Sequence, residues 1–286
     1  HGPDCCHRFC GSKQIDAAMA ITAWSEGHRV LYHWEKFSEE RLSALLRDKR
    51  IYCSNPASFN DPWDCKPHFN TEILNDLAER QKHAQWAIDL CQRKSPMPPE
   101  AQERMRQTFL HNPAAAAKLI NQLSGEMAGS IDEQYRVYCL GPDPNNLLMW
   151  SHYADSHRGI CLEFSLRNKI FCAALKCEYS SAFPIMKLHD NSDDTALLSL
   201  LAKSDVWSYE KEYRLIVQEE SKALPDSESL KSTGHFLEFP QGALVSVITG
   251  CQSDHQRIHD LVKSVDPTVA VKQATRVPNR FEISIA

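Results

Sequence analysis

Alternating apolar and polar positions mark a series of short strands along the chain. The alternation predicts strands at 30–34, 49–54, 135–140, 159–164, 212–217, 244–248, 269–272 and 281–285. Apolar residues at helical spacing predict one helix over 37–47, with Ser38 as its cap, and another over 254–262. The second helix falls between two strands, so the C-terminal part is expected to form a β-α-β unit followed by a final strand.

Between about residue 70 and residue 134 the pattern becomes helical, with a proline-rich interruption at 96–99. We expect three or four helices inserted into a single α+β domain that spans 29–286. Its sheet is expected to be mixed, largely antiparallel and twisted, with a split sheet as the variant. Residues 1–28 are expected to be a leader, either flexible or introduced by cloning, with Met19 as a natural start.

The net charge and the cysteine content indicate which classes of protein this chain could belong to. The formal net charge is -5 with both signs mixed, so no broad basic face for nucleic acid is expected. No apolar run approaches the roughly 20 residues that span a bilayer. The 11 cysteines are an odd number and mostly lie singly in apolar segments, which favours reduced thiols and a cytoplasmic location.

One N-terminal cluster offers four zinc-capable side chains within six residues: Cys5, Cys6, His7 and Cys10. Its spacing lacks the paired C-x-x-C pattern of a closed tetrahedral site, and no second half follows nearby. The pattern favours a leader over a metal site.

The first cluster that could carry chemistry follows the strand at 49–54. Polar side chains lie there around Phe59 and Trp63: Ser54, Ser58, Asn60, Asp61 and Asp64. One interpretation is an Asx-turn in which Asn60 and Asp61 cap the backbone before Pro62. The other is a site, because carboxylates beside aromatic walls suit a ribose hydroxyl, an amide or a cation.

The second cluster precedes the strand at 159–164. On a helical turn Met149, His152 and Tyr153 share one face, and Arg158 lies at the entry to the strand. A buried histidine bonded to backbone would explain His152 alone. A histidine, a tyrosine and an arginine beside Trp150 together also indicate a binding site.

The third cluster enters the strand at 212–217. Alternation places Glu212, Arg214 and Ile216 on one face, and Glu210 continues that face if the chain is extended there. The group is either a structural Glu-Arg ion pair or a carboxylate that polarises a ribose hydroxyl or acts as a general base.

Four motifs together resemble a known family: LYHW (31–34), RIYCSNPASFNDPWDC (50–65), LLMWSHYADSHRGICLEF (147–164) and WSYEKEYRLI (207–216). Their order and spacing resemble the bacterial family known as domain of unknown function 2971. The family name implies no activity.

A more distant similarity is to ADP-ribosyltransferases, which carry a histidine on a first strand and a late glutamate. The similarity implies an enzyme that takes NAD as substrate, without a metal, and transfers ADP-ribose to a macromolecule or to water, in a toxin or defence role. Residue by residue, Glu212 or Glu210 would be the catalytic carboxylate. His33, with Tyr52 or Ser54, would hold the nucleotide.

The ADP-ribosyltransferase pattern gives the 150–158 cluster no role, so further roles are assigned from the residues themselves. Arg158 would bind phosphate, and His152 and Tyr153 would position the ribose or the acceptor. Contributions to the nucleotide site are also assigned to Asn60, Asp61 and Arg214. Trp34 stands where these enzymes have a small residue, and the second strand lacks their Ser-Thr-Ser tripeptide.

Two other functions stay open. Asp61, Asp64, Glu210 and Glu212 could hold a divalent metal in a hydrolase or nuclease. A non-enzymatic module could bind or sense a nucleotide or small ligand in a pocket walled by tryptophans, with the helical insertion contacting a partner.

Overall fold

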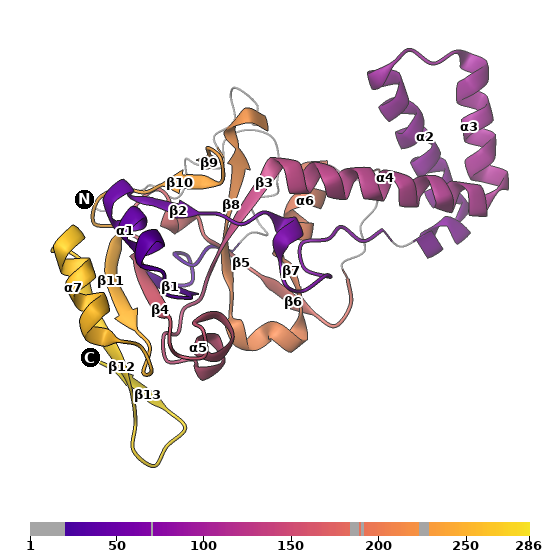
Figure 1. The fold of residues 1–286 in the computed structure, drawn as a ribbon. Coiled ribbons are helices and arrows are strands. Elements are labelled where there is room, and N and C mark those ends of the chain that lie inside the picture. The colour runs from indigo at the N-terminus through magenta and orange to yellow at the C-terminus, as the bar shows by residue number, and fades with distance from the viewer. Residues whose placement is uncertain (1–20, 70, 184–188, 190–191, 223–228) are drawn as a thin grey trace.

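The computed structural model describes residues 21–69, 71–183, 189, 192–222 and 229–286 (Figure 1). Cys5, Cys6, His7 and Cys10 and the proposed start at Met19 lie outside the described residues, as does most of the predicted leader. No described helix is long and apolar enough to cross a membrane.

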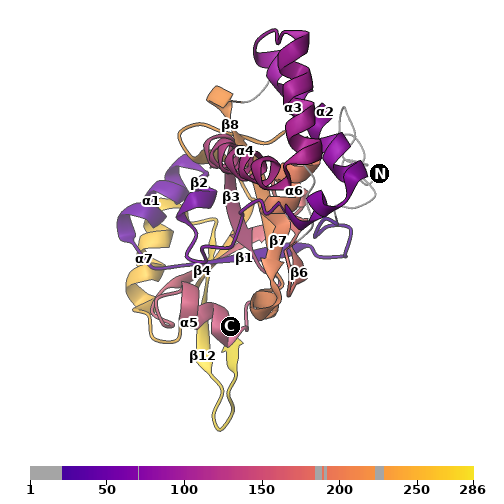
Figure 2. The ribbon, with the colours of Figure 1, turned by 90° about the vertical axis from the view of Figure 1, so that its right-hand side faces the viewer.

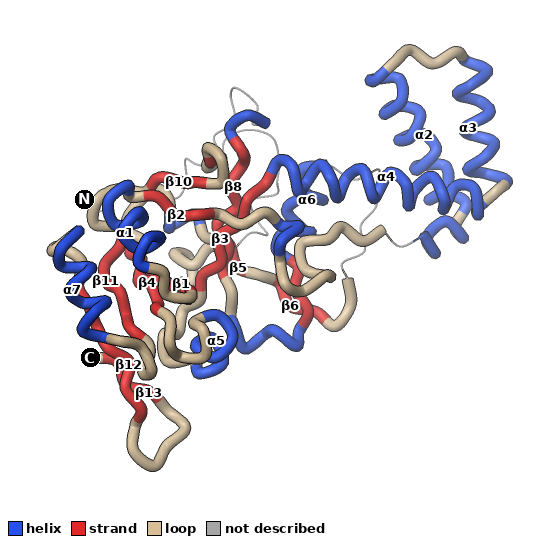
Figure 3. The backbone as a smooth tube through the Cα atoms, in the orientation of Figure 1, coloured by secondary structure: helices blue, strands red, loops and turns tan. Residues whose placement is uncertain are grey.

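The largest sheet has five strands in the order β1 (Val30–Glu35), β4 (Ile160–Ser165), β11 (Leu244–Thr249), β12 (Ala270–Arg276) and β13 (Ile283–Ile285). Neighbours are antiparallel except β11 and β12, which are parallel and joined by α7 (His255–Val265). The predicted β-α-β unit and final strand are confirmed. Helix α1 (Glu39–Asp48), capped by Ser38, lies beside α7, and their apolar faces enter the core with Leu31 and Leu162 (Figures 1 and 3).

A second group of strands lies beside this sheet. In it β8 (Tyr213–Glu219) pairs with β3 (Tyr135–Leu140), β5 (Leu175–Lys176) and β9 (Lys231–Ser232), while β2 (Arg50–Tyr52) pairs with β10 (Phe236–Glu238). Isolated bridges from Tyr32 to Gly141 and from Ser54 to Val137 connect β3 to β1 and to the chain after β2. The sheet is therefore mixed, mostly antiparallel and divided, which confirms the α+β class.

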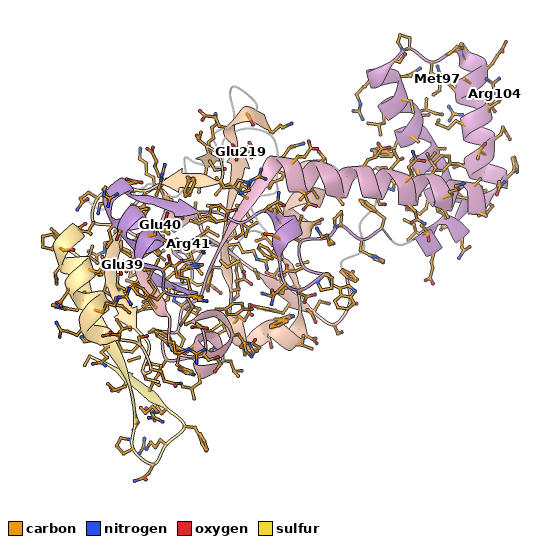
Figure 4. All side chains as sticks on the ribbon, in the orientation of Figure 1. Glu39, Glu40, Arg41, Met97, Arg104 and Glu219 are labelled. Carbon is orange, nitrogen blue, oxygen red and sulfur yellow. The ribbon has the colours of Figure 1, made fainter. Side chains whose placement is uncertain are left out.

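The helical insertion is confirmed over the predicted range. It contains a short 3-10 helix, η2 (Thr71–Asn75), then α2 (Leu77–Lys94), α3 (Pro99–His111) and α4 (Pro113–Gln134), which runs directly into β3. Its apolar side chains, including Phe109 and Ile120, form a core of their own. Helices α2 and α3 project away from the sheets, and Figure 2 shows the β12–β13 hairpin at the opposite end. Figure 4 shows Met97 and Arg104 on this projection, far from Glu39 on α1.

Some short elements were not predicted. Besides β5, β9 and β10, they are β6 (Glu178–Ser180), α6 (Ser192–Leu201), β7 (Ala202–Ser204) and the 3-10 helix η4 (Asp205–Glu210). The helical turn expected for Met149, His152 and Tyr153 is present as α5 (Leu147–Tyr153). The strands β6 and β7 pair with each other and have only three residues each, too few for a period to emerge.

One prediction about the third cluster is corrected. The chain is not extended from Glu210 to Glu212, because Glu210 ends η4 and Lys211 adopts a left-handed conformation with φ 47°. The alternation inside β8 holds, since Tyr213 and Leu215 pack into the main core while Arg214 faces away from it.

Candidate functional site

A cavity of about 510 Å³ opens where the loop after β2 meets the end of β6, β7 and η4. Aromatic and charged side chains share its lining, and we name it the Trp pocket: Asp61, Trp63, Asp64, Phe183, Lys203 and Trp207. Its residues come from three parts of the chain: the parallel β6–β7 pair brings two of them together, and a hydrogen bond between Trp207 and Asp61 joins the loop after β2 to them.

Asp61 accepts hydrogen bonds from both tryptophans of the Trp pocket. One carboxylate oxygen accepts a hydrogen bond from Trp207 Nε1 at 2.7 Å, and the other accepts from the backbone N–H of Trp63 at 2.9 Å. The second bond is the Asx-turn that the sequence predicted for Asp61. Trp63 is 65% exposed, a large fraction for an indole, so its ring remains accessible to a ligand.

Lys203 lies between the Trp pocket and a group of buried carboxylates. Its ammonium nitrogen donates to Glu210 and Glu212, lies 3.7 Å from Asp64 and sits 5.6 Å from the centre of the Trp207 ring. Its side chain is only 7% exposed. Glu210 and Glu212 therefore approach one cation although the chain between them is not extended.

Arg214 completes this group and is fully buried. It donates to Glu212 through Nε at 2.8 Å, to Asp64 at 2.7 Å and to the backbone carbonyl of Leu200 at 2.6 Å. We call the five side chains Asp64, Lys203, Glu210, Glu212 and Arg214 the charge cluster. Three acids and two bases leave it one negative charge in excess when all are ionised.

The two glutamates of the charge cluster experience opposite environments. Burial would raise the pKa of Glu212, but Arg214 and Lys203 outweigh burial and hold it below its ordinary value. Burial and the neighbouring charge of Glu212 raise the pKa of Glu210. Glu210 is therefore the more readily protonated of the two carboxyl groups.

Helix α5 joins the second and third predicted clusters. Asn146 caps α5 and also donates to the backbone carbonyl of Tyr209 at 2.7 Å. Tyr153 donates its hydroxyl hydrogen to Glu210 at 2.6 Å, and His152 Nδ1 lies 2.9 Å from the Tyr209 hydroxyl. Arg158 does not join them, because it is exposed and pairs with Asp155.

His33, Tyr52 and Ser54 do not line the Trp pocket. His33 Nδ1 lies 2.8 Å from the backbone carbonyl of Cys139, and burial lowers the pKa of His33 to about 4. Tyr52 is exposed and stacks on His235, while Ser54 pairs through its backbone with Val137. The predicted nucleotide residues of the first two strands therefore lie outside the lining of the Trp pocket.

His33 belongs to a second group of polar side chains, on β1 and β3, that the sequence did not predict. His33 stacks on Tyr138 with ring centroids 4.2 Å apart, and the buried Tyr138 hydroxyl has no hydrogen-bond partner among the residues that the structure describes. Burial raises the pKa of nearby Glu35 to about 7. Glu35 follows His33 at strand spacing, which was the available signal.

Lys203 and Arg214 would compete with a metal ion for the carboxylates that the sequence predicted as metal ligands. Asp61 is engaged by Trp207, and Asp64, Glu210 and Glu212 all face Lys203 or Arg214. Two protein cations thus occupy the side on which these acids converge. Lys203 was the residue that sequence reasoning missed, since it lies outside every motif.

Comparison with known proteins gives one finding. A family model described as "Protein of unknown function (DUF2971)" matches residues 149–215, from within α5 to within β8. No match was found among the curated proteins or among the solved structures. The matched segment contains Tyr153 and most of the charge cluster, namely Lys203, Glu210, Glu212 and Arg214. The resemblance of this chain to the uncharacterised family is therefore confirmed over that segment.

Proposed function

We propose that the Trp pocket binds a small ligand with a planar, electron-poor ring, and that the nicotinamide end of NAD is its first candidate. The observation that carries the proposal is the meeting of two indoles and two carboxylates on one cavity, in which Asp61 fixes the walls. Ligand pockets have volumes of about 300–1,000 Å³ and combine aromatic walls with a few placed polar groups. The cavity falls within that range.

Charge favours a cationic or electron-poor ring over an anionic one. Indole faces attract cations through their ring quadrupole. Asp61 and Asp64 line the pocket, and the charge cluster behind Lys203 has an excess of one negative charge. A positively charged nicotinamide ring would gain from these acids, whereas a phosphate would find Lys203, which already serves three carboxylates, and Lys66, which pairs with Asp132.

Cleavage of NAD is the enzymatic form of this proposal. The bond between nicotinamide and ribose would break with its electron pair going to nicotinamide, and the ribosyl cation would be captured by water or a macromolecular acceptor. A carboxylate stabilises such a cation. Glu210 and Glu212 are the candidates because each is one hydrogen bond from Lys203 in the lining. A cytoplasmic toxin or defence role belongs to this form.

The binding form has independent support. Both glutamates are 3% exposed and engaged by Lys203, and Glu212 is also engaged by Arg214. A pocket whose acids are already paired suits a module that senses a nucleotide without cleaving it. In both versions of the proposal NAD binds at the same site, and only in the enzymatic version is it cleaved.

The test is ligand binding by titration calorimetry with NAD and with nicotinamide. Trp63→Ala should weaken binding by about 5- to 150-fold, since stacking of a base on an aromatic ring is worth about 1–3 kcal/mol. Phe281→Ala is the matched control, because Phe281 is a fully exposed aromatic residue on the hairpin before β13. Equal affinity of Trp63→Ala and wild type would contradict the assignment of the site.

Nicotinamide release from NAD then separates the two forms. Release that is lost in Glu210→Gln or Glu212→Gln, with NAD binding retained, would support cleavage. Binding without release would support the sensing form. Absence of NAD binding to the wild type would remove NAD as the ligand and leave the ring chemistry to be tested with other planar cations.

A further inference from the structure

Two histidines and a glutamate converge at the base of the helical insertion, outside the Trp pocket. Glu79 and His83 lie one turn apart on α2, and His189 comes from the segment between β6 and α6. One ligand atom from each lies within 4.8 Å of the others. We propose that these three side chains bind a divalent transition metal, with zinc as the first candidate.

His83 has the hydrogen bond that orients a metal-binding imidazole. Its side chain is 2% exposed, and its Nδ1 lies 2.8 Å from the backbone carbonyl oxygen of Glu79. A carbonyl only accepts, so Nδ1 carries a hydrogen, and in the neutral ring Nε2 then carries the lone pair. Metal-binding histidines are typically held in this way, by a hydrogen bond from the other ring nitrogen.

His189 and Glu79 already approach each other as two ligands of one metal would. His189 Nε2 lies 3.0 Å from Glu79 Oε2, and the rings of His83 and His189 are 4.7 Å apart and nearly perpendicular. Zinc binds imidazole nitrogen and carboxylate oxygen at about 2.0–2.2 Å, so adjacent ligand atoms lie about 3.3 Å apart around it. The observed contact needs only a small expansion.

The ligand set itself selects the metal. Two imidazoles and one carboxylate match zinc sites that keep a fourth position for water, and they suit calcium or magnesium poorly because those ions prefer oxygen. Binding would displace any proton shared by His189 and Glu79, and the interaction of Glu79 with Lys82 at 3.3 Å would weaken. Metal affinity should therefore fall as pH falls.

The position of the site gives the metal a structural consequence. The metal would join α2 of the insertion to His189. His189 follows Phe183, a lining residue of the Trp pocket, by six residues in the sequence. The inference does not depend on the proposed function, because the three ligands do not line that pocket.

The experiment is zinc binding to the full-length chain, measured by competition with a chromophoric chelator, and cobalt(II) binding followed by absorption. His189→Ala is the main variant because its side chain is 17% exposed and its loss should leave the fold intact. His83→Gln is the second variant, and His111→Ala, on the exposed face of α3, is the matched control. Far-ultraviolet circular dichroism verifies folding of each.

We expect one metal per chain at this site, with cobalt absorption typical of nitrogen and oxygen ligands. His189→Ala and His83→Gln should each lose more than about tenfold in affinity, since the loss of an outer-shell partner alone costs 10- to 100-fold. His111→Ala should bind as the wild type does.

Three outcomes would overturn the proposal. One is no zinc binding by the folded wild type at neutral pH, and another is equal affinity of His189→Ala and wild type. The third is cobalt absorption with thiolate charge transfer that disappears in a Cys5→Ser, Cys6→Ser, Cys10→Ser variant, because that result would assign the metal to the N-terminal cysteines.

Discussion

At the scale of single residues, Arg214 connects carboxylates of the charge cluster that are far apart in the sequence. Its side chain is 0% exposed and contacts carboxylates from two distant segments, Asp64 before the insertion and Glu212 directly before β8. A buried ion pair need not stabilise a protein more than apolar residues of the same shape, because both charges lose their hydration. Removal of one partner is costly, since the remaining charges stay buried.

Arg214→Ala should therefore lower the free energy of unfolding by about 3–5 kcal/mol, because Asp64 and Glu212 would lose their buried counter-ion. Urea denaturation followed by circular dichroism measures the change. The control is Arg257→Ala, which breaks an exposed ion pair with Glu39 and should leave the free energy of unfolding nearly unchanged, because solvent screens such a pair. Similar small losses in both variants would show that Lys203 alone compensates the buried acids.

At the scale of elements, a tight connection places α5 against the main sheet. Three successive residues between α5 and β4 have positive φ: Asp155, Ser156 and His157 at 47°, 53° and 65°. Gly159 follows them, and a Cβ there would lie 2.3 Å from the backbone oxygen of Glu35. This close approach of backbones sets the position of α5, and thus of Tyr153 beside Glu210.

Gly159→Ala should destabilise the protein by about 1–3 kcal/mol or more, as overpacking against backbone does, since the oxygen of Glu35 belongs to a paired strand. Thermal denaturation measures the loss. Gly125→Ala is the control, because Gly125 lies in α4 with open space around it, and alanine there should stabilise the helix by about 0.5–1 kcal/mol. Opposite signs are expected, and a neutral Gly159→Ala would contradict the close contact.

At the scale of the whole molecule, the helical insertion and the sheets have separate cores. Phe109 packs with Leu74, Ala84 and Ile120 in the insertion, whereas Phe164 of β4 packs in the main core. Helices α2 and α3 stand away from the sheets in Figure 1. Regions with separate cores can open at different free energies.

Phe109→Ala should therefore destabilise the insertion by about 3–5 kcal/mol and leave the sheet core largely intact. Hydrogen exchange with mass spectrometry should show faster exchange in α2 and α3, with β4 and β11 as protected as in the wild type. Phe164→Ala, the matched substitution in the main core, should accelerate exchange in the strands. Equal acceleration everywhere in Phe109→Ala would indicate a single cooperative unit.

The sequence by itself determined the elements whose pattern repeats often enough to be recognised. These are the long helices of the insertion, the six-residue strands and the β-α-β unit, together with the motifs that carry the family resemblance. It also offered the Asx-turn of Asp61 as one of two interpretations, because an Asx-turn is formed within three residues. Such features depend on local backbone preference and on the burial of one face, and both are encoded by neighbouring residues.

Only the tertiary structure decided which polar groups meet. Lys203, on a three-residue strand without a motif, lies among three carboxylates, while His33 and Tyr52 lie apart from the Trp pocket. His189 reaches Glu79 across 110 positions of sequence. Contacts of this kind arise when separately patterned elements pack together, and side-chain periodicity within one element carries no information about its partner.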